Sequence, residues 1–158
     1  MIIGIICVDA WQCFFEKGFN DPDKVFATYS KEKYTNLVKL LKWAESNDNC
    51  IIHNINYNTR PSIIDTHNIK HTTSRVPLCK YDILICCGMS FDGCIFHRGY
   101  EKFKGFGETC YCSEASYLWV DGQNQPMHIK KDRGLLDTAE KDFLKKKGIN
   151  NILLDELM

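Results

Sequence analysis

The stretch from Ile83 to Phe96, ILICCGMSFDGCIF, carries three of the nine cysteines of the chain. A glycine-containing turn interrupts its apolar run, and Cys94 follows this turn where the pattern predicts the start of a helix. A helix N-terminus presents free N–H groups and positive potential, which lower the pKa of a thiol and can bind an oxyanion. Cys86 and Cys87 lie inside the predicted strand and lack this setting. Cys94 is therefore the candidate nucleophile, and a buried structural cysteine is the alternative interpretation.

A carboxylate is expected at the same edge of the predicted sheet. Ile2 to Val8 form a β-branched run typical of a strand buried on both faces of a parallel sheet, and Asp9 follows directly. Tyr81 to Cys87 form a similar run that ends at the turn before Cys94. Ligand clefts of such sheets lie at the carboxyl ends of the strands. We therefore expect the two strands to be parallel neighbours, with Asp9 and Cys94 facing one crevice.

The other predicted elements continue an alternation of helix and strand. They are a helix over Tyr29–Ser46 with Ser30 as its cap, a strand over Cys50–Asn58, a helix from about Gly93, a strand region over Glu108–Val120, and a helix over Asp137–Lys147 that ends at Gly148. A turn-rich break, DGQNQP, precedes the last helix. This order predicts an α/β fold, a three-layer α/β/α sandwich with a mainly parallel central sheet, formed by one domain over residues 1–158.

Composition narrows the classes of partner. The chain has 158 residues, 44% of them apolar, which is enough for the core of one domain. Basic and acidic residues number 20 each, so there is no broad cationic field to favour nucleic acid or an anionic membrane. No apolar run approaches the ~18 residues that span a bilayer, and the first residues lack a secretory signal. We expect a cytoplasmic protein with a small-molecule substrate or ligand, and no nucleic-acid or membrane partner.

The cysteines also raise the alternative of a disulfide scaffold or a structural zinc site. Their number is odd, and several lie in strand-like runs, which favours buried, reduced thiols. Cys110 and Cys112 are potential zinc ligands, as are Cys86 and Cys87. However, the chain has no C-x-x-C pair, and neighbouring cysteines on a strand point to opposite faces. Structural zinc is therefore not favoured.

At its centre the sequence resembles the isochorismatase-like cysteine hydrolases, because CGMSFDGCIF has their G-x-x-x-D-x-C spacing. The opening IICVDAWQCFF is similar to the family's first strand, which ends in Asp followed by Gln and Phe, although Gln12 stands one residue later than usual. GINNILLDELM resembles the family's closing segment. The resemblance implies an isochorismatase-like fold and hydrolysis of an amide or related bond in a small molecule. Members commonly form dimers or larger assemblies, so we expect a homo-oligomer.

Carried over by position, the resemblance implies roles for individual residues. Cys94 would be the nucleophile, and Asp9 the base that takes the thiol proton and returns one to the leaving group. A cis peptide between Met89 and Ser90 would aim the backbone N–H groups of Ser90 and Cys94 at the developing oxyanion. Asp92 is interpreted instead as a turn or helix-cap residue.

The third member of the family's triad is a lysine, and here the sequence departs from the pattern. The segment before the central strand is short and lacks the family's Ser-Ala-Phe-like signature. Lys70 is the candidate catalytic lysine, although it stands nearer to the turn than expected. Arg60 stands at a better distance, but its protonated form is too stable to shuttle protons. Lys80 is interpreted as a surface residue, and an incomplete triad stays open.

Nicotinamidases within this family bind a metal through an Asp-x-His arrangement after the second strand and a further histidine. The segment HNINYNTR has no such pattern. His53 falls inside the predicted strand, and the i, i+4 pair of His67 and His71 lacks a third partner nearby. We therefore expect no metal and no cofactor.

The leading functional hypothesis is a cysteine hydrolase in which Asp9 activates Cys94. A degenerate, non-catalytic protein of the same fold that binds a small ligand or a partner protein is the alternative. A third hypothesis is an α/β binding module unrelated to the family.

Overall fold

The computed structural model describes residues 1–118 and 127–158. Within these residues, five strands form one parallel sheet in the order β2-β1-β3-β4-β5. The strands are β1 (Ile3–Val8), β2 (Cys50–Ile55), β3 (Ile83–Met89), β4 (Glu108–Tyr117) and β5 (Asn150–Asn151). The helices are α1 (Gln12–Phe19), α2 (Lys24–Glu45), α3 (Ile63–Thr66), α4 (Glu101–Phe103), α5 (Met127–Lys130), α6 (Arg133–Lys147) and α7 (Leu154–Leu157), with a π-helical turn η1 (Ile95–Tyr100) and a 3-10 turn η2 (Lys104–Phe106).

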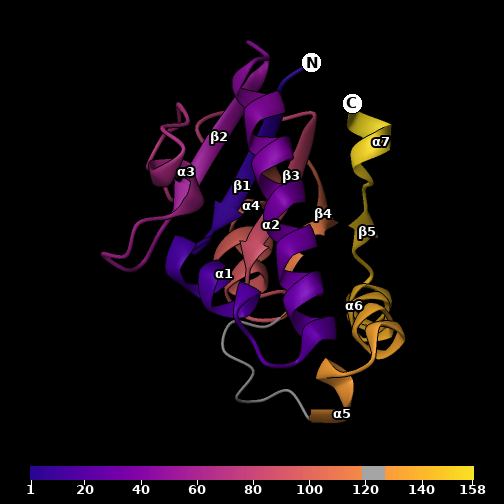
Figure 1. Cartoon of the computed structure of the whole chain (residues 1–158). Helices are drawn as coiled ribbons and strands as arrows, with labels where there is room; N and C mark the ends of the chain where they lie inside the picture. The colour runs from indigo at the N-terminus through magenta and orange to yellow at the C-terminus, as the bar shows by residue number, and fades with distance from the viewer. Residues whose placement is uncertain (119–126) are drawn as a thin grey trace.

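Helices cover both faces of this sheet. Figure 1 shows α2 in front of the strands with α1 beside it, and α4 behind them. Helix α2 packs against β2 and β4, whereas η1 packs against β1 and β3. All six residues of β1 are buried, as expected for a strand covered on both sides. The predicted three-layer α/β/α fold with a parallel sheet is therefore confirmed.

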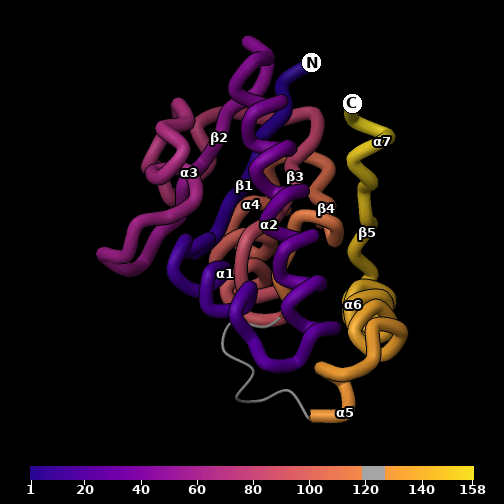
Figure 2. Tube along the Cα trace, in the orientation of Figure 1, coloured from indigo at the N-terminus to yellow at the C-terminus, as the bar shows by residue number. Residues whose placement is uncertain are grey.

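The strands run in one direction, so their carboxyl ends form a common edge. In the trace of Figure 2, both chain termini lie at the top, and β1 and β3 descend toward the segment that carries α1. Strands β1 and β3 pair in parallel, with Val8 opposite Gly88. The predicted pairing of these two strands is confirmed, and Asp9 and the turn after β3 open at the same edge of the sheet.

Gly88 allows β3 to bend beside β1 at this edge. Its φ of +109° lies in a region that other residues rarely adopt. A Cβ atom at Gly88 would stand 2.3 Å from the carbonyl oxygen of Val8. Only glycine fits this approach, which is why the apolar run is interrupted here.

Two predicted helix starts are wrong. Helix α2 begins at Lys24, where the side chain of Asp23 accepts hydrogen bonds from backbone N–H groups of the first turn. Ser30, the predicted cap, is buried in the helix and its hydroxyl donates to the carbonyl oxygen of Phe26. Helix α6 begins four residues before the predicted Asp137, behind an Asp132 cap. In both cases an aspartate upstream of the apolar pattern supplies the cap.

Other boundaries were predicted more closely. Helix α6 ends at Gly148, which is left-handed with φ +67°, as the sequence indicates.

Strand β2 ends at Ile55 rather than at the predicted Asn58, because the next residues turn toward Asp9. Helix α1 was not predicted as an element. The predicted extension of the fourth strand to Val120 and the DGQNQP break fall on residues 119–126, which lie outside the described residues.

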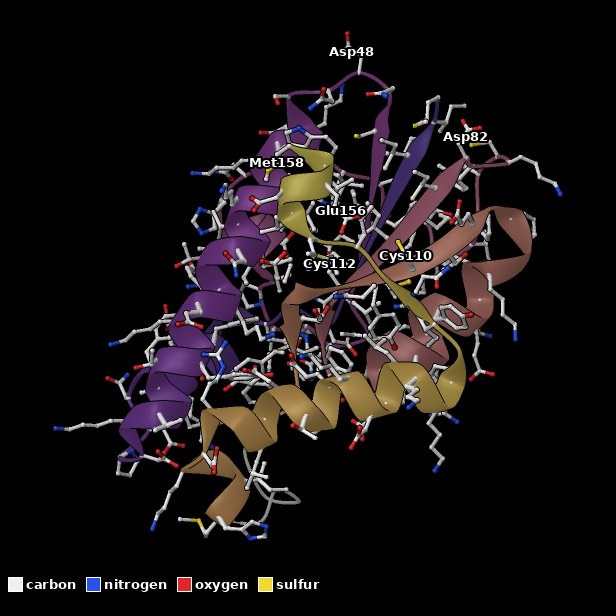
Figure 3. All side chains as sticks on the ribbon, turned by 90° about the vertical axis from the view of Figure 1, so that its right-hand side faces the viewer. Asp48, Asp82, Cys110, Cys112, Glu156 and Met158 are labelled. Carbon is white, nitrogen blue, oxygen red and sulfur yellow. The ribbon has the colours of Figure 1, made fainter. Side chains whose placement is uncertain are left out.

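All nine cysteines lie in the described part of the chain, and none forms a disulfide. Figure 3 shows Cys110 and Cys112 on β4, where the C-terminal segment crosses the edge of the sheet. Burial raises the pKa of Cys110 to about 12 and that of Cys112 to about 11. In the ranges 1–118 and 127–158, no three His, Cys, Asp or Glu side chains could hold a metal ion, and no helix is long and apolar enough to cross a bilayer.

Candidate active site

Asp9 is a buried acid at the carboxyl edge of the sheet. Its side chain is 1% exposed, and its backbone takes a left-handed φ of 45°. Oδ1 accepts a hydrogen bond from the backbone N–H of Tyr57 at 2.9 Å, and Oδ2 lies 3.0 Å from Nη1 of Arg98. A residue other than glycine rarely takes this conformation, and such outliers concentrate at functional sites. The carboxylate is thus buried, oriented and paired with a cation.

The turn after β3 brings Cys94 to the same edge. The peptide between Met89 and Ser90 is cis, as the resemblance implies. The carbonyl oxygen of Ser90 accepts hydrogen bonds from the N–H groups of Gly93 and Ile95, each at 3.1 Å. In the described part of the chain, the N–H groups of Ser90 and Cys94 donate to no carbonyl oxygen. The turn therefore leaves two backbone donors next to the thiol.

The Cys94 thiol is half-buried and lies near enough to Asp9 for the carboxylate to act on its pKa. Burial raises the pKa of this thiol, and the hydrogen bond and negative charge of Asp9 raise it further. The charge of Arg98 and the backbone N–H of Ser90 lower the pKa by less. The predicted lowering of the Cys94 pKa by a helix N-terminus is therefore wrong, because burial and the adjacent carboxylate outweigh it. Burial and Asp9 together therefore favour the protonated form of the thiol.

Arg98 is a residue of the candidate site that the sequence analysis missed. It follows Cys94 by four residues, so the η1 turn brings both side chains to the same side. Its guanidinium contacts the Asp9 carboxylate and lies over the ring of Tyr57, 4.0 Å from the ring centroid. The i, i+4 spacing of Cys94 and Arg98 in CIFHR was the signal that could have found it.

Lys70, the predicted catalytic lysine, lies at the other end of the sheet. It lines a separate pocket with Glu45 and Cys50, and its backbone N–H donates to the Glu45 carboxylate. Cys50 begins β2, which runs parallel to β1, so this pocket opens opposite to Asp9. After α3 the chain returns to the start of β2 at Lys70, and the following residues run parallel to β2, where Thr72 pairs with His53 at the strand edge. The assignment of Lys70 to the site is therefore corrected.

The histidines have structural partners. Nε2 of the buried His53 lies 2.7 Å from the hydroxyl of Tyr81, and burial lowers the pKa of this histidine. Nε2 of His67 lies 2.8 Å from the hydroxyl of Tyr34. His71 contacts the backbone oxygen two residues before it. None of the three lies in a group that could hold a metal among the described residues.

No protein-family model and no curated protein matches the chain. Among solved structures, it is similar to an isochorismatase-like hydrolase from Alkaliphilus metalliredigens, with a TM-score of 0.60 and 9% sequence identity over 99% of this chain and 97% of that one. It is also similar to the nicotinamidase/pyrazinamidase PncA from Bacillus subtilis, with a TM-score of 0.51 and 10% identity over 96% and 99% of the two chains. The chain therefore has the isochorismatase-like fold.

Proposed function

We propose that the protein is a cysteine-dependent hydrolase that cleaves an amide or related bond of a small molecule, with Cys94 as nucleophile and Asp9 as base. One observation carries this proposal: the Cys94 thiol lies within the electrostatic influence of Asp9, a buried carboxylate that is itself paired with Arg98. Both groups stand at the carboxyl ends of neighbouring parallel strands, where α/β sheets bind ligands. The two structures of similar fold, named as a hydrolase and a nicotinamidase, support the same class of reaction.

In the first half of the reaction, the Cys94 sulfur bonds to the carbonyl carbon while the thiol proton passes to Asp9. The carbonyl oxygen gains negative charge and is bound by the backbone N–H groups of Ser90 and Cys94. Asp9 then protonates the leaving amine as the C–N bond breaks, which leaves a thioester on Cys94. The raised pKa of Cys94 suits this order, because the proton leaves during the attack rather than before it.

In the second half, water attacks the thioester carbon and gives a proton to Asp9. The C–S bond breaks, the carboxylic acid product departs, and the sulfur recovers the proton from Asp9. Atoms and charges thus balance over one turnover that consumes one water. Arg98 takes no proton in either half, because a guanidinium stays protonated in proteins. Its charge stands beside Asp9 where the resemblance implies a lysine.

The test is a screen of small primary amides for release of ammonia. Wild type should turn over at least one amide and form an acyl adduct on Cys94 that hydroxylamine removes, seen by mass spectrometry of acid-quenched samples. Cys94→Ala should abolish both signals. Cys13→Ala is the matched control, because Cys13 is exposed on α1. Ammonia release that persists in Cys94→Ala would refute the assignment.

A non-catalytic binding protein is the second candidate, and two observations favour it. Arg98 cannot relay protons as a lysine can, and the Cys94 thiol has a raised pKa that makes it slow to react. In that case a ligand that raises the melting temperature of wild type would raise that of Cys94→Ala equally. No product would form with either protein.

A further inference from the structure

Three of the four arginines in the chain stack on the aromatic rings of residues that follow β1 and β2. Arg98 and Arg75 each lie 4.0 Å from the centroid of the Tyr57 ring. The Tyr57 ring is thus a shared stacking platform for the two guanidinium groups. The backbone N–H of Tyr57 also donates to Asp9. Arg75 therefore stacks on the same aromatic ring as Arg98, the cation of the candidate active site.

The third arginine, Arg60, is connected to Arg75 by hydrogen bonds through Asn56. The Asn56 side chain accepts a hydrogen bond from Trp11 Nε1 at 2.8 Å and donates to the carbonyl oxygen of Arg60 at 2.8 Å. Its backbone oxygen accepts a hydrogen bond from Arg75 Nη2 at 3.2 Å. The Arg60 guanidinium lies over the rings of Trp11 and Phe14, 5.2 and 4.6 Å from their centroids. The loops after β1 and β2 thus hold the arginines in place.

The charges of these arginines are unevenly compensated. Arg98 pairs with Asp9, and the fourth arginine, Arg133, pairs with Glu32 and Asp137. Across residues 1–118 and 127–158, neither Arg60 nor Arg75 forms an ion pair with a carboxylate. The whole chain carries no net charge, so this gathering of cations is local. An anion bound among them would relieve their mutual repulsion.

We propose that the substrate carries a carboxylate, which Arg75 and Arg60 bind while its scissile carbonyl meets Cys94. This substrate class rests on the proposed hydrolase function. A guanidinium matches a carboxylate with two parallel N–H donors, which gives orientation as well as affinity. Stacking on aromatic rings holds the arginines before the ligand arrives, so less side-chain freedom is lost on binding. The arginines would thereby select an acid amide over a neutral amide of the same size.

The proposal is tested through the alkylation of Cys94, which needs no turnover. Iodoacetate and iodoacetamide react with the same thiolate, but only iodoacetate is negatively charged. The alkylation ratio, defined as the rate with iodoacetate divided by the rate with iodoacetamide, is therefore independent of the thiol pKa. We expect this ratio at Cys94 to exceed that of N-acetylcysteine on the order of threefold to tenfold at low salt. The excess should shrink in 0.5 M NaCl, because salt screens charges.

Arg75→Met and Arg60→Met should each lower the alkylation ratio at Cys94 severalfold. Arg133→Met is the matched control and should leave the ratio unchanged, because Arg133 pairs with acids between α2 and α6. A wild-type ratio equal to that of N-acetylcysteine would overturn the proposal. A ratio that Arg75→Met and Arg60→Met leave unaltered would overturn it as well.

Protection by a ligand gives a second readout. Succinamate, an amide with a carboxylate, should slow the alkylation of Cys94 by iodoacetamide, and neutral succinamide should slow it at least fivefold less at equal concentration. Equal protection by both compounds would contradict the proposal. If carboxylate preference is found without any turnover, the hydrolase proposal fails and the anion site stands. If neutral amides are hydrolysed and the alkylation ratio is ordinary, the anion site fails and the hydrolase stands.

Discussion

Oδ2 of Asp9, at the end of β1, lies 3.0 Å from Nη1 of Arg98, 89 residues further along the chain. Arg98 stands on the η1 turn that begins beside Cys94. The candidate nucleophile and the cation therefore come from one turn of helix, and the acid that influences both comes from the neighbouring strand. The state of the thiol depends on both charges: Asp9 raises the pKa of Cys94, and Arg98 lowers it.

Replacement of Arg98 by methionine should raise the pKa of Cys94 further, because it removes a positive charge that opposes the effect of Asp9. Turnover on any substrate should fall on the order of a hundredfold, the usual effect of losing a charged group beside the reacting atoms. Arg98→Lys keeps the charge and should recover part of both properties. The measurement is the rate of Cys94 alkylation by iodoacetamide as a function of pH. A thiol pKa that is unchanged or lower in Arg98→Met would contradict the geometry.

Asp9→Asn should separate thiol reactivity from catalysis. The charge of Asp9 and its hydrogen bond both raise the Cys94 pKa, so the variant should have a lower thiol pKa and faster alkylation near neutral pH. Hydrolysis should nevertheless fall about 10²- to 10⁴-fold, because the proton acceptor and donor is lost. Asp92→Asn, at an exposed position of the same turn, should change neither quantity. Slower alkylation in Asp9→Asn would show that Asp9 activates the resting thiol.

A buried ion pair between α2 and α6 makes stability depend on pH. Nζ of Lys33 lies 3.0 Å from Oε1 of Glu140, with side chains 4% and 7% exposed. Burial raises the pKa of Glu140, and Lys33 and Tyr29 lower it by less. A carboxyl whose pKa is raised binds its proton more tightly in the folded state. Its contribution to stability therefore falls as the pH rises from the ordinary value of 4.5 toward the raised pKa.

Lys33→Met leaves Glu140 buried without its cation and should raise the Glu140 pKa further. The free energy of unfolding should drop by about 3–5 kcal/mol at pH 7.5, and by less at pH 5, where Glu140 is more easily protonated. Lys31→Met, on the exposed side of the same helix, should stay within about 0.5 kcal/mol of wild type. Urea denaturation at the two pH values measures both. An equal loss at both values would mean that Glu140 does not titrate in this range.

Gly88→Ala should destabilise the protein by about 2–4 kcal/mol through backbone strain and overpacking. The added methyl group would meet the carbonyl oxygen of Val8 at 2.3 Å, at a φ of +109°. Gly105→Ala is the control, because no atom lies within 4 Å of its added Cβ. Thermal unfolding should show a large fall in melting temperature for the first variant only. Equal melting temperatures would imply that β3 does not approach β1 this closely.

The sequence alone determined the layered fold and two residues of the candidate site. Unbroken β-branched runs such as Ile3–Val8 are stable only when both faces are covered, so they require a sheet between helices. Asp9 and the Gly88 turn each follow such a run directly, and parallel strands bring their carboxyl ends to one edge. The local sequence pattern was sufficient to find Asp9 and Cys94, because each residue follows a buried strand by only one or a few positions.

Only the tertiary structure showed which cation lies beside Asp9 and in which direction the pKa of Cys94 is shifted. The sequence pointed to Lys70 and not to Arg98, but after α3 the chain returns to the start of β2 and so carries Lys70 to the opposite end of the sheet. The pKa of Cys94 depends on burial and on a carboxylate 85 positions earlier in the chain, not on its own helix turn. Electrostatic energies follow distance and dielectric in space, which a local pattern of residues does not encode.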